Sequence, residues 1–460
     1  MRILRTALLF LLLAFTGKTV SAQNLKISDE PGQFIVQLRK LIDGSRNPQY
    51  IRSAAQLDSI WMSSLNASQQ TKFINIVKTQ IAKGQKAGPV MYLLVRNAHA
   101  FAKQSPENLD GFLDLATQSG QKYDGKALQR ILETVKAVNE SNKLYAANYN
   151  SLYLLSGSHK YRFDTTSAEA ANAEANVAAM NDSWDTPVDS NFVIAPKSTP
   201  LPAISGAIMD LQNATFAMVA GGDSVVFGPT NGSIALKDGI FVGKNGKFNW
   251  RAAGDSSIYA DLDTYSFNIT QPKLVADNVT LHNDQKLAAP IKGKLEYRGV
   301  KKIKGQPAPY PRFVSNGIDA RLKDNRKNID YKGGFALIGT EMYSSSLSDL
   351  PSTVKVKYKD KLAFTAQSKK FVLQDSVIAA SFATYSMPLG GDSLYHPGVA
   401  FRYNDDEGLV KLGRVERTDY APLPYKDTYH KMNIWSQAMR WRFPNDKVEF
   451  FRSMVSKLLP

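Results

Sequence analysis

The sequence of 460 residues predicts an α+β protein in two parts, a helical N-terminal domain followed by a long β-rich domain. Apolar residues recur with the helical period from about residue 25 to residue 158, and with a period of two from about residue 206 onward. Asn-Gly and Asp-Gly turns separate the segments of the second part, as in antiparallel hairpins. A composition of 43% hydrophobic and 10% aromatic residues fits a globular chain with a sizeable core and excludes a wholly disordered one.

The first 22 residues have the pattern of a secretory signal peptide. Arg2 and Arg5 give a charged start, Ala7–Phe15 is an unbroken apolar run, and Val20 to Ala22 presents small residues where a signal peptidase cleaves. An uncleaved membrane anchor is the alternative, but the apolar run is too short to cross a bilayer. We expect an exported protein of the periplasm, the outer-membrane surface or the bacterial cell surface, with no transmembrane helix after cleavage.

Six amphipathic segments follow, and most of them have a recognisable beginning or end. Proline suits the first turn of a helix, and glycine suits the left-handed position after the last turn. Pro31 and Gly44 bracket the first segment in this way. Loops of a few residues make neighbouring helices antiparallel, as in a bundle or a short helical array. Five helices are expected to begin near Pro31, Pro48, Ser68, Pro89 and Pro106, and a sixth is expected to contain Leu128.

A change of composition separates the two parts. The stretch from about residue 164 to residue 203 is rich in Ala and ends with two prolines, which predicts a linker. Beyond it, apolar and polar residues alternate, as at Ile258, Ala260 and Leu262, and an antiparallel sandwich, an open jellyroll and a β-solenoid all fit this pattern. The predicted parts are a signal peptide (1–22), a helical domain (23–160), a linker (161–204), a β-rich domain (205–445) and an apolar C-terminal segment (446–460).

The β-rich part resembles the periplasmic lipopolysaccharide-transport family over about residues 206–410. The resemblance lies in the short strands and polar turns of Ile258–Leu281, with repeated Ala-Asp steps such as Ala260-Asp261. It implies an open, edge-exposed β-jellyroll and transfers no site. Tyr310–Phe313 and Tyr395–Gly398 resemble parts of large uncharacterised bacterial envelope proteins, again without a site.

The chain is basic, and its positive charge is concentrated toward the C-terminal third. Its 57 Lys and Arg residues exceed its 41 Asp and Glu residues and give a net charge of +16. On an exported protein, a basic face favours anionic partners such as lipopolysaccharide or acidic polysaccharide, and nucleic acid is not expected there. The alternative is that these side chains only protect an edge strand from aggregation. The basic candidate ligand-binding residues are Lys292, Lys294, Arg298, Lys301, Lys302, Lys304 and Arg312.

Few chemistries are compatible with the remaining residues. Cysteine is absent, which excludes disulfides, thiolate catalysis and thiolate metal sites. The five histidines are scattered and form no metal-binding pattern, so neither a metal nor another cofactor is expected. His430 follows Asp427 closely, and aromatic residues gather late in the chain, where they suit stacking on sugar rings. Tyr425, His430 and Trp435 therefore join the candidate ligand-binding residues, and no residue is named as catalytic.

Two functions from different classes fit these patterns. The lead hypothesis is a non-catalytic cell-envelope scaffold or binding protein for anionic glycan or lipid headgroups. The alternative is a polysaccharide-active or other hydrolase with an aromatic and acidic cleft in the β domain. Such a hydrolase needs two carboxylates that face each other across a sugar, usually from different strands.

The C-terminal segment from residue 446 is apolar with basic interruptions. Two structures fit it, a bare edge strand or an amphipathic helix over Lys447–Leu459 with Phe451, Met454 and Val455 on one face. Either structure leaves an apolar surface that needs a cover. We therefore expect this segment to dock on another envelope protein, or the chain to be the N-terminal part of a longer one.

Overall fold

A computed structural model describes residues 27–85, 87–166, 200–301, 303–323, 328–415, 423–443, 445 and 447–452. The chain divides into two compact units, Met1–Lys136 and Ala137–Pro460. In the described part, six α-helices precede an antiparallel sheet of 24 strands, which confirms the predicted α+β class. The predicted signal peptide and most of the predicted linker lie outside the described residues.

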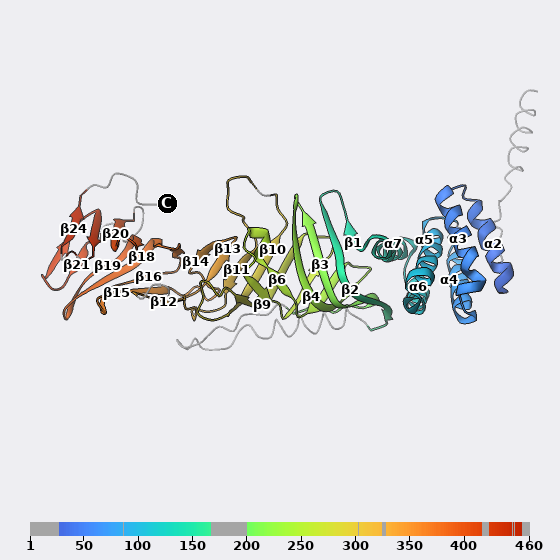
Figure 1. Ribbon diagram of the computed structural model, residues 1–460, viewed down its shortest axis with the longest axis horizontal. Coiled ribbons are helices and arrows are strands. Elements are labelled where there is room, and N and C mark those ends of the chain that lie inside the picture. The colour runs from blue at the N-terminus through green and yellow to red at the C-terminus, as the bar shows by residue number, and fades with distance from the viewer. Residues whose placement is uncertain are drawn as a thin grey trace, which may run out of the picture. The chain divides into compact units, whose positions relative to one another are not determined.

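The helical unit begins its helices with the local signals that the sequence carries. Glu30 accepts hydrogen bonds from two backbone N–H groups of the first turn, and Asn47 does the same for the second helix. Asn66 and Gln69 form a capping box, so the third helix begins at Ala67 rather than at Ser68. The helices are α2 (Pro31–Asp43), α3 (Pro48–Ser64), α4 (Ala67–Ala82), α5 (Pro89–Gln104), α6 (Leu109–Lys122, after a 3-10 turn at Pro106–Asn108) and α7 (Gly125–Ser141), of which α2 to α6 lie side by side in Figure 1.

An aromatic cluster closes the core between the first three helices. Trp61 on α3 stacks on Phe34 of α2 with ring centroids 5.3 Å apart, and its edge meets Phe73 of α4 at 5.7 Å. All three rings are completely buried. None of the described helices combines the length and the apolar character that crossing a membrane requires.

The β unit consists of strands that pair only antiparallel with one another. Its first half contains β1 (Lys143–Ala146), β2 (Asn150–Asp164), β3 (Gly206–Ala220), β4 (Asp223–Ala235), β5 (Ile240–Lys244), β6 (Lys247–Asn249), β7 (Tyr259–Asp261), β8 (Thr264–Asn268), β9 (Lys273–His282), β10 (Ile291–Arg298), β11 (Arg312–Ser315) and β12 (Ile329–Lys332). The second half contains β13 (Ala336–Ile338), β14 (Glu341–Tyr343), β15 (Ser352–Tyr358), β16 (Lys361–Ser368), β17 (Val372–Leu373), β18 (Val377–Leu389), β19 (Asp392–Asn404), β20 (Leu409–Arg414), β21 (Tyr425–Asp427), β22 (Met432–Ile434), β23 (Ala438–Arg442) and β24 (Val448–Phe451).

The predicted helical domain extends too far toward the C-terminus. Residues 143–160 were assigned to the helical domain, but this stretch contains β1 and most of β2, whose last residues, 161–164, fall in the predicted linker, and the compact units divide at Lys136. The physical reason is visible in β2, where Leu152 and Leu154 are buried on alternate residues. Gly157 then adopts a φ of +111°, which no helix accommodates.

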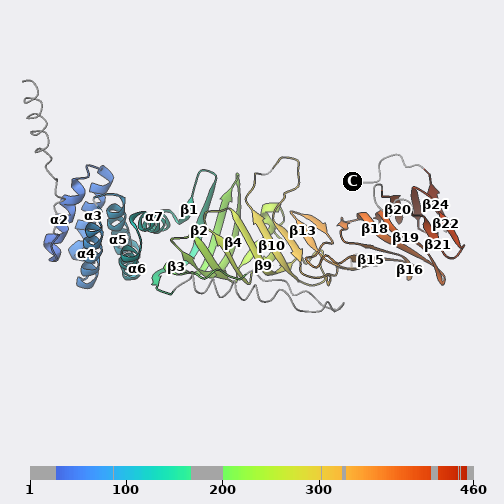
Figure 2. The same cartoon turned by 180° about the vertical axis from the view of Figure 1, so that it is seen from behind.

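The long strands β2, β3 and β4 bend at neighbouring positions. The pairing register shifts on both sides of Ser156 and again at Ala214, and Gly228 on β4 has a φ of +125°. Beyond its bend, β4 changes partners: residues 231–235 pair with β5, whereas Phe227 pairs with β6. At these bends the sheet curves so that two parts of it pack against each other face to face. Figure 2 shows the strands of this part of the sheet from behind.

Aromatic side chains fill the space between these faces. Phe216 of β3 lies 5.2 Å from Phe241 of β5 and 5.9 Å from Phe267 of β8, measured between ring centroids. Further along the chain, Phe364 of β16 and Phe401 of β19 pack in the same way, 5.8 Å apart. The sheet thus buries two aromatic clusters and leaves its outer face for polar residues.

The prediction of a C-terminal helix is wrong for the described residues of that segment. Val448–Phe451 form β24, which pairs with β23 through Phe451 opposite Ala438. This agrees with the other expectation for the segment, an edge strand, because no second neighbour of β24 occurs among the described residues. The alternating exposure of β24 favours a strand, since its side chains meet the sheet on one face only. Residues 453–460 lie outside the described part.

Candidate functional site

The predicted basic residues separate into two groups in the structure. Lys292, Lys294 and Arg298 alternate with buried residues on β10, so all three side chains project from the outer face of the sheet. Lys301 and Lys304 lie in the exposed connection between β10 and β11, and Lys302 is outside the described residues. Only the first group shares a surface with Arg312, the remaining basic candidate.

Strand register assembles that surface from four strands. One cross-strand row on the outer face runs Lys294, Val314, Ala336 and Tyr343, because β10 pairs with β11, β11 with β13 and β13 with β14. The neighbouring row runs Glu296, Arg312, Ile338 and Glu341. Residues of both rows, apart from Glu341, line a groove of about 250 Å³ together with Ser345, Leu347 and Lys370. We call it the outer groove.

Two of the predicted cations on β10 already have carboxylate partners. Lys294 Nζ lies 2.9 Å from a carboxylate oxygen of Asp277, and Arg298 Nε lies 2.6 Å from one of Glu296. These ion pairs restrict the two side chains and reduce the positive electrostatic potential at this surface. The predicted residues Lys294 and Arg298 are therefore partly occupied by structural ion pairs.

Arg312 and Lys370 are held in a different way. The Arg312 guanidinium lies 4.5 Å from the centre of the Tyr310 ring, and its Nε donates to the Pro309 carbonyl oxygen at 2.9 Å. Lys370 Nζ lies 4.7 Å above the ring of Tyr343. No carboxylate of the described residues lies within ion-pair distance of either cation. Both keep hydrogen-bond donors for an external anion.

Tyr343 shows that this surface is partly dehydrated. Burial raises the pKa of the Tyr343 hydroxyl above its usual range, and Glu341, which accepts a 2.8 Å hydrogen bond from that hydroxyl, adds to the effect. Tyr343 and Lys370 were not among the predicted residues. They reach the groove only through the pairing of β13, β14 and β17.

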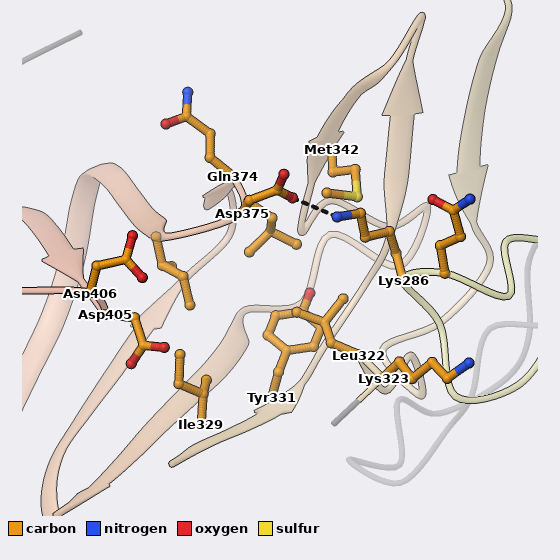
Figure 3. Close-up of a pocket in the computed structure, with 13 residues that line it drawn as sticks. Lys286, Leu322, Lys323, Ile329, Tyr331, Met342, Gln374, Asp375, Asp405 and Asp406 are labelled. Carbon is orange, nitrogen blue, oxygen red and sulfur yellow. Dashed lines mark hydrogen bonds and ion pairs between the residues drawn. The ribbon is translucent and has the colours of Figure 1, made fainter. Parts of the chain in front are cut away.

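A second, larger cavity of about 410 Å³ has a mixed lining (Figure 3). Tyr331 and Ile329 of β12 contribute apolar walls. Lys286 and Asp375 form an ion pair of 2.5 Å on one side. On the other side lies Asp406, from the turn between β19 and β20, next to Asp405.

The carboxylates of this cavity bear on the hydrolase alternative. Asp375 is held by Lys286, and Asp405 accepts a 2.8 Å hydrogen bond from the Tyr403 hydroxyl. Two of the three acidic groups are therefore engaged by neighbours, and the third, Asp406, stands beside Asp405 on the same turn. Carboxylates from two separate turns therefore line this cavity, and the two that contact Lys286 and Tyr403 are engaged in interactions within the fold.

The aromatic candidates do not share a cleft. Tyr425 is buried in the core with 1% of its surface exposed, whereas Trp435 is 63% exposed. His430 donates to Asp427, with its Nδ1 2.8 Å from a carboxylate oxygen, and this contact belongs to the turn after β21. Among the described residues, no group of three or more metal-ligating side chains could hold a metal ion.

The contact between His430 and Asp427 predicts a measurable titration. Burial acts to raise the pKa of the Asp427 carboxyl, but the hydrogen bonds from the backbone N–H and imidazole of His430 outweigh it, so the pKa is lowered overall. A carboxyl with a lowered folded-state pKa stabilises the fold above the unfolded value of about 3.9, and this contribution is lost as pH falls through the folded-state pKa. In a carbon-13 titration of the Asp427 carboxyl, we expect His430→Ala to raise the pKa. Identical titrations in both proteins would contradict this account.

Comparisons with protein-family models, with curated proteins and with solved structures give no match to this chain. The geometry of the described residues is therefore the basis for assigning a function. Among the candidate sites, the outer groove is the one that combines predicted basic residues with an apolar floor.

Proposed function

We propose that the protein is an exported, non-catalytic binding protein of the bacterial envelope, and that its outer groove holds the charged end of an anionic amphiphile. A phosphate or carboxylate group would accept hydrogen bonds from Arg312 and Lys370. The single observation that carries this proposal is that these two cations border an apolar groove without a carboxylate partner among the described residues.

The floor of the groove favours an amphiphile over a purely polar polysaccharide. Val314 and Ile338 line the groove together with the two cations, and Leu347 of the same lining is 49% exposed. Burying apolar surface of a ligand here contributes roughly 25 cal/mol per Å². In an amphiphile, the charged headgroup would contact the two cations and the apolar chain would contact the apolar floor of the groove.

Arg312 is the better anchor of the two cations. Its guanidinium offers several N–H donors in a fixed plane, and the Tyr310 ring and the Pro309 carbonyl restrict its orientation. Lys370 is more exposed and acts as a mobile point charge. We therefore expect Arg312 to determine affinity and Lys370 to contribute more to salt dependence.

The proposal predicts that charge removal weakens binding selectively. We expect the mature chain to bind decyl phosphate below its micellar concentration, and Arg312→Gln with Lys370→Gln to weaken binding by on the order of tenfold or more, because hydrogen bonds to charged groups are lost. Isothermal titration calorimetry at two salt concentrations measures both effects. Decyl maltoside, which has the same chain and no charge, should bind weakly to either protein.

A matched variant separates this site from general basicity. Lys355→Gln with Lys357→Gln removes two exposed lysines from β15, away from the groove, at the same change in net charge. Its affinity for decyl phosphate should equal that of the unmodified protein. Equal losses in both double variants, or no binding at low salt, would remove the outer groove as the site. Binding of an acidic polysaccharide without any affinity for decyl phosphate would replace the amphiphile with a glycan.

A further inference from the structure

A polar cluster lies inside the β unit at a position where the sheet divides. β19 pairs with β20 through Val399–Asn404 and with β21 through Leu394 and Tyr395, so the residues between these segments face a fork. His396 lies at this fork and is 1% exposed. Its cross-strand neighbour on β18 is Tyr385, and the ring of Tyr425 on β21 lies 4.7 Å from the imidazole.

Three donors of this cluster are buried without an acceptor among the described residues. They are the hydroxyls of Tyr385 and Tyr425 and the Nε–H of Arg414. Tyr385 has no exposed surface, and Tyr425 has almost none. Arg414 ends β20 opposite Val399, whose side chain is also completely buried. A buried donor without a partner costs about 1–3 kcal/mol, so three of them at one place need an explanation.

The neighbouring polar groups do not supply the missing acceptor. Two hydrogen bonds fix the tautomer of His396: Nε2 donates to the Leu423 carbonyl at 3.1 Å, and Nδ1 accepts from the Gly398 N–H at 3.1 Å. Burial lowers the pKa of this imidazole, and the charge of Arg414 adds to the effect, so it stays neutral. Asp427, two residues beyond Tyr425, is engaged by His430.

The residues of the cluster influence one another's pKa values. Burial raises the pKa of the Tyr425 hydroxyl, and the positive charge of Arg414 partly opposes this. Burial also raises the pKa of Tyr385, and Tyr425 adds to that increase. Both phenols therefore remain protonated and retain their O–H donors at neutral pH. Among the described residues, the cluster contains one positive charge and no carboxylate that could balance it.

We propose that Tyr385, Tyr425 and Arg414 hold a small carboxylate-type anion inside the β unit. Two phenolic hydroxyls and one guanidinium N–H supply hydrogen bonds that suit the two oxygens of a carboxylate. A water molecule would also bond the hydroxyls, but it would leave the half-buried charge of Arg414 without a counter-charge. The site is distinct from the outer groove, since no residue of the cluster lines that groove.

Formate is the probe, because it is the smallest carboxylate. We expect saturable binding of formate to the full chain at constant ionic strength, measured by isothermal titration calorimetry. Tyr385→Phe with Tyr425→Phe keeps both rings and removes both hydroxyls, so it should fold and bind formate on the order of tenfold more weakly or worse. Arg414→Gln should also weaken binding.

The control is Tyr265→Phe, which removes a buried hydroxyl from the other half of the unit, where it donates to Thr230 at 2.9 Å. This variant should bind formate as the unmodified protein does. Absence of saturable binding would show that the cluster holds water only and would overturn the proposal. Unchanged affinity in the double phenylalanine variant would overturn it as well.

Discussion

Replacing Gly157 with alanine is expected to destabilise the β unit by about 3 kcal/mol or more. Gly157 has a φ of +111°, a conformation that residues with a Cβ rarely adopt. An added Cβ would lie 2.7 Å from the Cα of Ala214 and 2.8 Å from the carbonyl oxygen of Gln212. Both contacts are with backbone, so no side-chain rotation relieves them. Denaturant unfolding followed by circular dichroism measures the loss.

Gly222→Ala separates backbone strain from steric overlap. Gly222 has a φ of +82° in the turn between β3 and β4, but a Cβ there would meet no atom within 4 Å. Its substitution should therefore cost only the conformational penalty, about 1 kcal/mol. If both substitutions lower the free energy of unfolding by the same amount, Gly157 is not required for the close approach of β2 and β3 at their bends.

The bends are important because they allow two parts of one sheet to pack against each other and bury the aromatic side chains between them. Without the register shifts near Ser156 and Ala214, β2 and β3 would continue straight, and the rings of Phe216 and Phe241 would lie on an open face. A folded sheet buries them between its two halves instead. Gly157 therefore links a local backbone property to the packing of the whole first half of the unit.

The order of helices and strands could be predicted because local chemistry determines it. Pro31, Pro48 and Pro89 each stand at the first turn of a helix, as the sequence indicated. The period of two likewise identified the strand-rich region. The boundary failed because β1 and β2 follow α7 without a proline or a change of composition that would mark the end of the helical part.

The outer groove could be predicted only in part. Lys294 and Arg312 belong to a basic stretch that is visible in the sequence, whereas Lys370 is separated from them by more than fifty residues. Its position follows from the order in which β11, β13, β14 and β17 pair, and strand order is a property of the folded sheet. Tyr425 shows the converse, since an aromatic residue near other aromatics was assigned to a surface and proved to be core.

Replacing Trp61 with alanine is expected to destabilise the helical unit by about 3–5 kcal/mol. Trp61 has no exposed surface, and its ring packs on Phe34 and Phe73. Its indole Nε1–H donates to the Pro31 carbonyl oxygen at 3.0 Å, which ties α3 to the first turn of α2. Alanine removes both contributions and leaves a cavity among three helices. Denaturant unfolding followed by the helical circular dichroism signal measures the loss.

Two further variants apportion the effect of Trp61. Trp61→Phe keeps an aromatic ring but loses the hydrogen bond and some volume, so it should cost less than alanine, roughly 1–3 kcal/mol. Met62→Ala changes the adjacent residue, which is 73% exposed, and should stay within about 0.5 kcal/mol of the unmodified protein. Similar losses for Trp61→Ala and Met62→Ala would mean that the aromatic cluster does not hold α2, α3 and α4 together. A loss for Trp61→Phe as large as that for alanine would instead assign most of the stabilisation to the bond between the indole and Pro31.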